Sequence, residues 1–595
     1  MEIVKPIVEL IDDTNMGLKK FKIILKSKTG KERELINEYP IVYIHNWQKG
    51  TKYEVYVGES NDFFQRTLQH YEQIENPNSW QKNLKSKVAS LYVIAHEDFN
   101  KSLTLDVENK LIHYLSSCSS VEKIYNARGN PQNKYYPCEE FDAIFSNIWK
   151  QLRRYNRALF LSESEIKDSA IYKASPLHKL NFEQNLAKEK ILDTIQECLI
   201  KNHNHQMVLV QGDAGTGKTV LMSSMFYELI NHQKVVVEEG NDEHYDIETA
   251  IIVNHEEQLT VYKEIVKKLD LVKNNENIVF KPTEFINLFL DKKNSPKKRK
   301  KLYDVVFIDE AHLLLTQKNQ AFTQDDSQLD EIIKYAKIVV VMFDKKQIMN
   351  AEQYISNNQI NKYINLAKFN DSYIELKIQM RMRINKSLQK WLQKITEEGI
   401  IDKCPYNRGK YEIVSFDTPF NLEKAIKEKA LIKETALSRI IATYDWKYSG
   451  TSSPKNDKYW KVTIGTWSKP WNRELIRYNK VAKKNTNGLA WAEQPQTINE
   501  VGSTYTIQGF DLNYAGVILG PSIKYRNGKI MFDPSKSCNH RATQRRKLKD
   551  GTSKSFGEIF LKNELGVLLT RGVNGLYIYA CDEELRKKLN KSINK

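Results

Sequence analysis

Short runs of consecutive apolar residues recur through the later part of the chain, with longer helix-like stretches between them. The runs at residues 207–210, 251–253, 305–308 and 339–343 are rich in Val, Ile and other apolar residues. Runs without polar alternation are typical of strands that are buried on both faces of a parallel sheet. Their alternation with helical stretches predicts an α/β lobe over residues 180–347.

A second series of the same kind follows the first. Its strand candidates are residues 411–416, 461–467, 516–519 and 575–579. This series predicts a second parallel α/β lobe over residues 348–595. The full length of 595 residues is more than one hydrophobic core can organise, so several domains are expected.

The N-terminal part of the chain has a different pattern. Two β-runs, residues 40–44 and 53–58, are joined by a turn and followed by helical stretches. This order predicts a small α+β domain over residues 37–150. We expect residues 1–36 to form an N-terminal extension, and the polar and charged residues 151–179 to form a linker.

The run at residues 207–210 leads directly into a glycine-rich loop of the form GxxxxGK[ST]. Helical residues follow the loop, so the motif has the strand–loop–helix context that it requires. Its glycines allow backbone N–H groups to surround phosphates, while Lys218 would reach the β- and γ-phosphates and Thr219 would hold Mg²⁺. The residues expected to bind the nucleotide are Gly212, Asp213, Ala214, Gly215, Thr216, Gly217, Lys218 and Thr219.

Two carboxylates follow the apolar run at residues 305–308. Asp309 would hold the Mg²⁺ through water, and Glu310 would orient and deprotonate the attacking water. A surface acidic pair is the alternative, but it does not explain why the carboxylates end four consecutive apolar residues. The two motifs together predict hydrolysis of ATP with Mg²⁺.

Composition narrows the class of protein further. Hydrophobic residues make up 41% of the chain, which is typical of a globular protein. No apolar run approaches the length of a membrane span, no signal peptide is visible, and 6 cysteines lack C-x-x-C spacing. We therefore expect a cytoplasmic protein with reduced thiols and no membrane partner. The net charge of +17 favours nucleic acid as the partner, and the sequence leaves the oligomeric state open.

Further motifs follow the order found in superfamily 1 helicases. Asn254-His255 resembles the motif that lines the nucleic-acid path, and residues 504–511 resemble the motif that couples nucleotide state to strand contact. In detail the chain is similar to a bacterial helicase-like family grouped with the Schlafen ATPases, on residues 438–446 and on Trp471-Asn472. The resemblance implies that the two α/β lobes are RecA-like and that their closing and opening moves a bound strand.

The helicase resemblance also implies roles for residues around the triphosphate. Gln347 would sense the γ-phosphate, and Arg381 would be the arginine finger. Arg571 would be a second arginine at the γ-phosphate, and Gln184 would read adenine. Two arginines and a lysine around one triphosphate at a lobe interface would make hydrolysis depend on lobe closure.

The predicted small domain carries a separate constellation. Tyr43 and Tyr56 lie on its two β-runs, Arg66 and His70 share one face of a helical stretch, and Glu108 lies in a later helical run. These residues resemble a GIY-YIG nuclease. The resemblance implies that Glu108 binds Mg²⁺ or Mn²⁺ and that Tyr43 activates water. It also implies that Arg66 stabilises the transition state and that Tyr56 and His70 position groups or exchange protons.

Departures from the family's pattern leave the proton path open. The first glycine of the family's motif is replaced by Ile41, and a lysine that often follows the second motif is Glu59 here. Taken one at a time, the two tyrosines fit core aromatics of a hairpin, and Arg66 with His70 fits a solvated helix face. As an ordered set, these residues favour the nuclease.

The sequence thus predicts an ATP-dependent translocase or helicase coupled to an endonuclease, acting on DNA rather than RNA. The family resemblance suggests a role in bacterial defence against foreign DNA. Two alternatives stay open: a nucleotide-gated switch that binds nucleic acid without cleavage, and an RNA-directed helicase–nuclease.

Overall fold

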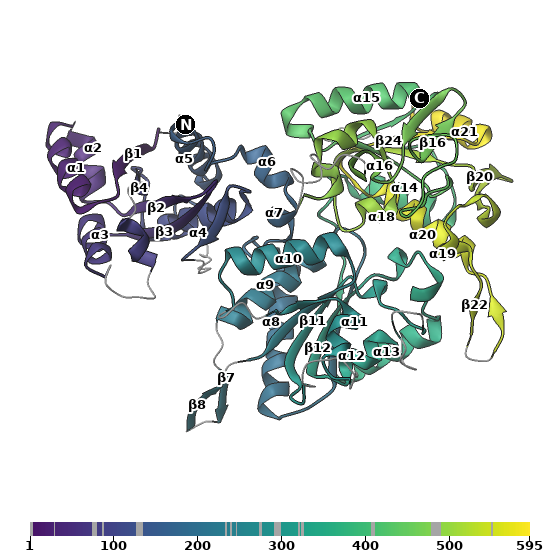
Figure 1. Ribbon diagram of the computed structural model, residues 1–595, viewed down its shortest axis with the longest axis horizontal. Coiled ribbons are helices and arrows are strands. Elements are labelled where there is room, and N and C mark those ends of the chain that lie inside the picture. The colour runs from purple at the N-terminus through teal and green to yellow at the C-terminus, as the bar shows by residue number, and fades with distance from the viewer. Residues whose placement is uncertain are drawn as a thin grey trace. The chain divides into compact units, whose positions relative to one another are not determined.

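The computed structural model describes residues 4–594 except for 29, 74–79, 86–88, 127–134, 232–234, 239–240, 246, 273–276, 291–298, 319–321, 323–326, 406–410, 478–488 and 549–550. The chain forms two compact units (Figure 1). Unit 1 consists of residues 1–180, 226–232 and 261–277, and unit 2 consists of residues 181–225, 233–260 and 278–595. No helix in the described part of the chain is long and apolar enough to cross a membrane.

Unit 1 is built on a mixed sheet of five strands in the order β1-β4-β2-β3-β5. The strands β1, β4, β2 and β3 pair antiparallel, and β5 joins β3 in parallel. The strands are β1 (Ile7–Asp12), β2 (Ile41–Lys49), β3 (Lys52–Ser60), β4 (Ala89–Ala95) and β5 (Val121–Ile124).

Helices cover both faces of this sheet. Alternate residues of β2 divide between the two faces, so that Val42 and Ile44 pack in one core and Ile41 and Tyr43 in the other. Leu111 and other residues of the later helices share the first core. The helices are α1 (Asn15–Ser27), α2 (Gly30–Asn37), α3 (Phe63–Glu72), α4 (Lys101–Ser117), α5 (Phe141–Tyr155), α6 (Glu163–Asp168) and α7 (Ala170–Ala174).

The edges of unit 1 differ from the boundaries expected at residues 37 and 150. Strand β1 pairs with β4 along its whole length, and Leu18, Phe21 and Leu25 of α1 are buried in the second core. The described residues before position 37 therefore contribute β1, α1 and most of α2 to the domain. The stretch expected as a linker contains α6 and α7, and its Ile166 is buried in the first core.

The first lobe of unit 2 is a parallel sheet of six strands in the order β10-β9-β11-β12-β6-β13. Its buried strands contain the apolar runs that predicted them. Because the strands are parallel, the carboxyl ends of β6, β11 and β12 meet at one edge. The strands are β6 (Gln206–Gly212), β9 (Thr249–Val253), β10 (Val279–Phe280), β11 (Tyr303–Asp309), β12 (Ala336–Phe343) and β13 (Tyr373–Leu376).

The second lobe has a parallel sheet of five strands in the order β14-β24-β19-β15-β18. The parallel α/β lobes expected from the sequence are thus both present, and the mixed sheet of unit 1 agrees with a small α+β domain. The strands of this sheet are β14 (Glu412–Ser415), β15 (Arg439–Ala442), β18 (Val501–Gly502), β19 (Leu512–Leu519) and β24 (Gly572–Ala580).

One strand prediction in the second lobe was wrong in its placement. Residues 461–467 do not join the parallel sheet, because β16 (Lys461–Ile464) pairs antiparallel with β17 (Trp467–Pro470) in a separate hairpin. Gly465 in the connecting turn has φ +58°, which a glycine adopts without steric cost. The central sheet uses β15 in its place, whose residues are all buried.

The helices of unit 2 surround the two sheets (Figure 1). They are α8 (Phe182–Ile200), the first parts of α9 (Lys218–Asn231) and α10 (Glu256–Lys268), whose later residues are counted in unit 1, and α11 (Pro282–Asn287), α12 (Gln328–Ile333), α13 (Asn357–Phe369), α14 (Lys386–Gln393), α15 (Pro419–Leu431), α16 (Glu474–Arg477), α18 (Thr504–Ile507), α19 (His540–Thr543), α20 (Gly557–Leu569) and α21 (Glu583–Ile593).

Candidate functional site

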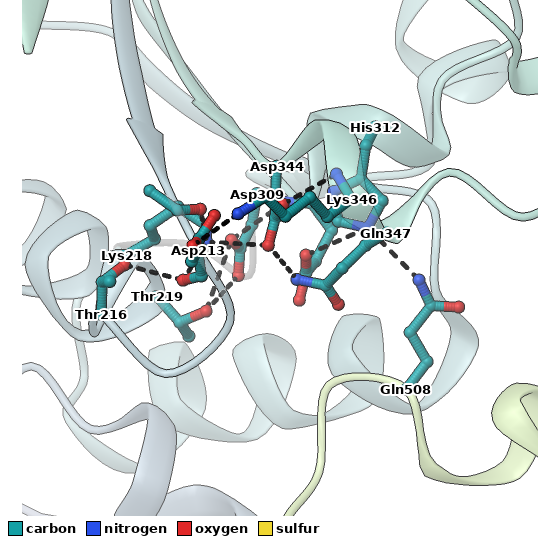
Figure 2. Close-up of polar contacts among 12 residues, drawn as sticks. Asp213, Thr216, Lys218, Thr219, Asp309, His312, Asp344, Lys346, Gln347 and Gln508 are labelled. Atoms are coloured by element: carbon teal, nitrogen blue, oxygen red, sulfur yellow. Dashed lines mark hydrogen bonds and ion pairs between the residues drawn. The ribbon is translucent and has the colours of Figure 1, made fainter. Parts of the chain in front are cut away.

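The phosphate-binding loop connects β6 to α9 at the carboxyl edge of the first sheet. Gly215 and Gly217 have φ of +86° and +78°, so the loop depends on residues that adopt the left-handed region. Lys218 begins α9, and its Nζ donates to the carbonyl oxygens of Gly212 at 2.6 Å and Asp213 at 3.1 Å (Figure 2). The ammonium group therefore lies inside the loop, where it would meet a bound phosphate.

Thr219 and Asp309 form the pair expected to bind a metal ion. The Thr219 hydroxyl donates to Asp309 Oδ2 at 3.1 Å, and Asp309 ends β11 beside the loop (Figure 2). Hydroxyl and carboxylate oxygens are ligands that Mg²⁺ prefers, usually with several waters and with the phosphates of its substrate. The donor set thus fits Mg²⁺, which would neutralise charge on the β- and γ-phosphates.

Glu310 has an unusual backbone conformation. Its φ of 48° and ψ of 46° place a glutamate in the left-handed region, which is uncommon for a residue with a Cβ and is found at functional sites. The residue is 8% exposed, and its Oε2 has no hydrogen-bond partner among the described residues. A buried carboxylate oxygen without a donor is suited to accept a proton from water.

Gln347 and Arg571 meet beside this carboxylate. Arg571 Nη2 donates to Gln347 Oε1 at 3.2 Å, and Gln347 Nε2 donates to Asp344 Oδ2 at 2.7 Å. Arg571 follows α20 in the second lobe, whereas Gln347 follows β12 in the first. Burial lowers the pKa of Arg571 to about 10, so the guanidinium is still charged at neutral pH. The expected γ-phosphate sensor and second arginine are therefore neighbours.

Arg381 and the preceding Met380 lie against the phosphate-binding loop. The N–H of Met380 donates to Gly215 O at 2.8 Å, and a Cβ on Gly215 would lie 2.7 Å from Arg381 Cβ. Its guanidinium forms an ion pair with Asp511, with Nε 2.5 Å from Oδ1. Because Asp511 belongs to residues 504–511, which resemble the coupling motif, this ion pair connects the proposed arginine finger to that motif.

Gln184 adjoins the loop, but its amide is already engaged. Its Oε1 accepts the N–H of Asn181 at 3.0 Å in the N-terminal capping box of α8. Its Nε2 is 3.3 Å from Thr216 O and 3.4 Å from Gly217 O. Gln184 thus stabilises the loop through contacts with its backbone carbonyl groups. Recognition of adenine by Gln184 stays a prediction.

Unit 1 brings the five candidate nuclease residues together. Tyr43 on β2 and Tyr56 on β3 have stacked rings with centroids 6.4 Å apart. The Tyr43 hydroxyl is 3.1 Å from Nε2 of His70, which shares α3 with Arg66. Burial raises the pKa of both phenols, and the Arg66 guanidinium opposes that shift. Burial also lowers the pKa of His70 to about 3, so its ring is neutral at ordinary pH.

Glu108 on α4 lies close enough to both tyrosines for its charge to raise their pKa values. Asn126 Nδ2 donates to Glu108 Oε1 at 3.1 Å and to Val57 O at 2.9 Å, so this asparagine ties the carboxylate to strand β3. Burial, and then the charge of Glu59, raises the pKa of Glu108 to about 8. Such a carboxylate gains from a cation beside it.

A metal ion at Glu108 would need ligands from outside the protein. Among the described residues, no three His, Cys, Asp or Glu side chains cluster as a metal site. Mg²⁺ commonly binds through one or two carboxylates and takes its other ligands from water and phosphate. The donor set therefore fits a metal that is bound together with a nucleic-acid substrate, and the metal would polarise the scissile phosphate there.

A buried pair behind the tyrosines was not expected from the sequence. Asp13 and His45 are 0% exposed, with Asp13 Oδ2 2.7 Å from His45 Nδ1, and the Tyr71 hydroxyl donates to Asp13 Oδ1 at 2.9 Å. The His45 ring centroid lies 5.4 Å from that of Tyr43 and 5.6 Å from that of His70. Asp13 directly follows the edge strand β1. Its place at the end of this largely apolar stretch is the one sequence feature that could have indicated a buried role.

Comparison with known proteins agrees with an ATP-binding site at the phosphate-binding loop. Residues 205–582 match the family model of the Schlafen group 3 DNA/RNA helicase domain. The uncharacterized protein YPL245W of Saccharomyces cerevisiae is 31% identical over 436 residues, which span 69% of this chain and 90% of the yeast protein.

Two solved structures are more distant. One is a structure of two coordinating Pif1 helicases at forked double-stranded DNA, with 12% identity, coverage of 67% of this chain and 92% of the other, and a TM-score of 0.23. The second, Pif1 helicase from Candida albicans, has 13% identity, coverage of 43% and 55%, and a TM-score of 0.20. Likenesses this low add nothing to the argument about the site.

The segment that matches the family model contains the phosphate-binding loop, both acidic residues of β11 and its following turn, and both arginines. It confirms the prediction of a helicase-like ATPase that uses ATP with a divalent metal, and it implies binding of nucleic acid. The resemblance to the family grouped with the Schlafen ATPases is confirmed over the same segment. The chain belongs to the Schlafen group 3 DNA/RNA helicase domain family.

Proposed function

We propose that this protein is an ATP-driven translocase or helicase whose N-terminal unit is a metal-dependent GIY-YIG endonuclease. The observation that carries the proposal is that each unit collects a complete set of reactive groups. Unit 2 gathers Lys218, Asp309, Glu310 and Arg571 around the phosphate-binding loop. Unit 1 gathers its own set around the Tyr43 hydroxyl.

In the motor, hydrolysis depends on groups from both lobes. Lys218 would hold the β- and γ-phosphates, and Glu310 would take a proton from the attacking water. Arg571 would stabilise charge on the γ-phosphoryl group. Its position would depend on closure of the two lobes, because it contacts Gln347 of the other lobe. Hydrolysis would loosen this contact and allow the lobes to separate on the strand.

In the nuclease, Tyr43 would take a proton from the attacking water as its own proton passes to His70 Nε2. The contact between the Tyr43 hydroxyl and His70 Nε2 supports this route, because neutral His70 has a lone pair to accept with, whereas burial, which lowers the His70 pKa, opposes a full proton transfer. Arg66 would face the charge that develops on the phosphate, and Glu108 would hold the metal. Tyr56 stacks beside Tyr43 and would position its ring.

DNA is the proposed substrate, and the net charge of +17 supports a polyanionic partner. An RNA-directed enzyme is the second candidate, since the family description names both nucleic acids. A role in defence against foreign DNA stays a prediction from the resemblance.

End-labelled single-stranded, duplex, forked and RNA substrates, incubated with the purified protein with and without ATP and Mg²⁺, test the proposal on one gel. We expect Glu108→Ala to remove cleavage and keep ATP hydrolysis, and Lys218→Ala to remove ATP hydrolysis. Slower cleavage by the Lys218→Ala variant would support coupling of the two sites. Metal-dependent cleavage that survives Glu108→Ala in a preparation free of other nucleases would contradict the nuclease site. Cleavage of no substrate would leave the nucleotide-gated switch.

A further inference from the structure

A cavity of about 280 Å³ lies between the two lobes of unit 2. Its polar lining comes from Asn254, His255, Asn350, Glu352 and Gln353 of the first lobe and from Tyr505, Gln508 and Arg541 of the second. Aromatic rings stack on nucleobases, amides bond to base edges, and a guanidinium binds phosphate. The lining therefore suits one nucleotide of a single strand, and such an occupant would touch both lobes at once.

The wall of this cavity also includes Leu313, the last residue of the short turn that follows the proposed catalytic base. Glu310 is followed directly by the 3₁₀ turn Ala311–Leu313. The carbonyl oxygen of Leu313 accepts from Asn254 Nδ2 at 2.7 Å and from Gln353 Nε2 at 3.1 Å. Two amides that face the cavity thus fix the end of the same short turn, so no long relay is needed between the cavity and the ATPase site.

A second connection runs through His312, which is 1% exposed. Gln508 reaches it from the second lobe, with Nε2 3.2 Å from His312 Nε2 (Figure 2). The same His312 nitrogen is 3.4 Å from Oε2 of Glu310. His312 Nε2 is therefore shared between a residue of the cavity wall and the proposed catalytic base.

The chemistry of imidazole makes this sharing exclusive. Burial lowers the pKa of His312, so the ring is neutral, and one of its nitrogens carries the only proton. If Gln508 donates to His312 Nε2, that nitrogen has no proton for Glu310. If the amide is turned round, its oxygen accepts the Nε2 proton instead. In either arrangement Gln508 engages the nitrogen that would otherwise donate to Glu310.

Without Gln508, the Nε2–H tautomer of His312 would donate to Glu310 Oε2. A carboxylate that accepts such a bond is a weaker base, because protonation would cost the bond. Separation of the lobes would produce this idle state, since Gln508 and His312 belong to different lobes. A ligand that binds better to the closed arrangement would favour the active state.

We propose that a nucleotide of the bound strand occupies this cavity and holds Gln508 against His312, which leaves the Glu310 carboxylate free to accept a proton. The proton then passes from water to Glu310, the water oxygen bonds to the γ-phosphorus, and the bond to the β-phosphate oxygen breaks to release ADP. This inference rests on the proposed motor function, because it states how the strand acts on hydrolysis.

Steady-state ATPase assays with and without saturating oligo(dT) test the idea on Gln508→Leu, His312→Leu and the double variant. With Gln508→Leu, we expect the strand-stimulated kcat to fall about tenfold, within the range of general-base effects. With His312→Leu, which removes the competing donor, we expect the rate without strand to rise toward the stimulated rate. The double variant should match His312→Leu, because Gln508 would act only through the imidazole.

Gln544→Leu is the matched control, since Gln544 is exposed and follows the helix that carries Arg541 without lining the cavity. Strand affinity from fluorescence anisotropy separates weak binding from weak catalysis, and thermal unfolding identifies a misfolded variant. If His312→Leu misfolds, His312→Phe replaces it. The His312 side chain also borders an apolar cavity, which suits an aromatic ring.

The outcomes distinguish a failure of the proposed motor function from a failure of the proposed role of Gln508 and His312. A wild-type ATPase that no nucleic acid stimulates would overturn the proposed motor function. A stimulated wild type together with full stimulation of Gln508→Leu at saturating strand would overturn only the inference. Additive effects in the double variant would also overturn it, because they would show that Gln508 acts by a route that does not include His312.

Discussion

Replacing Gly58 with alanine should impair the proposed nuclease activity and leave ATP hydrolysis intact. Gly58 on β3 lies directly opposite Tyr43 on β2. An alanine Cβ at this position would be 2.6 Å from both Cζ and the hydroxyl oxygen of Tyr43. Ordinary contacts begin near 3.4 Å, so the ring and the strand must move apart by the difference, 0.8 Å.

The Tyr43 ring has little freedom to make this movement. It is 1% exposed, with Tyr56 and Phe63 rings 6.4 Å and 5.9 Å away between centroids. Overpacking of this kind costs about 1–3 kcal/mol of stability. A displacement near 1 Å at a reacting group costs roughly 100-fold in rate, so we expect cleavage to fall by about that factor.

A cleavage time course on the preferred substrate, run beside an ATPase assay and a thermal unfolding scan, measures these effects. ATP hydrolysis should stay at the wild-type rate. Gly30→Ala is the control in the same unit, because a Cβ there would meet nothing within 4 Å. If Gly58→Ala cleaves within twofold of a cleaving wild type, the position of the Tyr43 hydroxyl does not govern the reaction and its assignment is wrong.

Three other changes have outcomes that follow from the site. Glu310→Gln should still bind ATP, measured with a fluorescent analogue, while hydrolysis falls at least about 100-fold because the proton acceptor is lost; near-normal turnover would exclude Glu310 as the base. Asp13→Ala leaves buried His45 without its partner and should destabilise unit 1 by about 3–5 kcal/mol in urea unfolding, with a smaller loss for Asp13→Asn; equal losses would show that the charge is unimportant. Glu564 is buried with its pKa raised to about 8, so it favours the folded state fully below its unfolded pKa and loses that contribution as pH rises through 8. Glu564→Gln should therefore melt at a higher temperature than wild type above pH 8 but not near pH 4 in scans across pH, and a constant difference would contradict the shift.

The parallel sheets could be predicted from the sequence because their strands are buried on both faces. Such strands contain almost only apolar residues, and those of β11 and β12 stand out in any window. The hairpin of β16 and β17 was placed in the wrong sheet because a short β-rich run does not say which partner it pairs with. Within the predicted run of residues 461–467, only Gly465 indicates a turn and therefore an antiparallel hairpin.

The candidate sites could be predicted where one motif contains the chemistry. Gly212 to Thr219 form a continuous loop, so the sequence names every residue in it. The contact between Gln508 and His312 joins residues 196 positions apart, and its existence depends on how two lobes pack. Asp13 and His45 meet through the order β1-β4-β2, which no local pattern reports.

Strand β1 also determines how unit 1 can be shortened. A fragment beginning at residue 37 would uncover the edge of β4 along all six residue pairs from Ile7–Ala95 to Asp12–Ser90. An exposed strand edge pairs readily with other chains, so this fragment should aggregate. It would also remove α1, leaving the side of the sheet around Leu91 and Val93 in water. A fragment that contains unit 1 alone should therefore keep β1 and α1 to remain soluble.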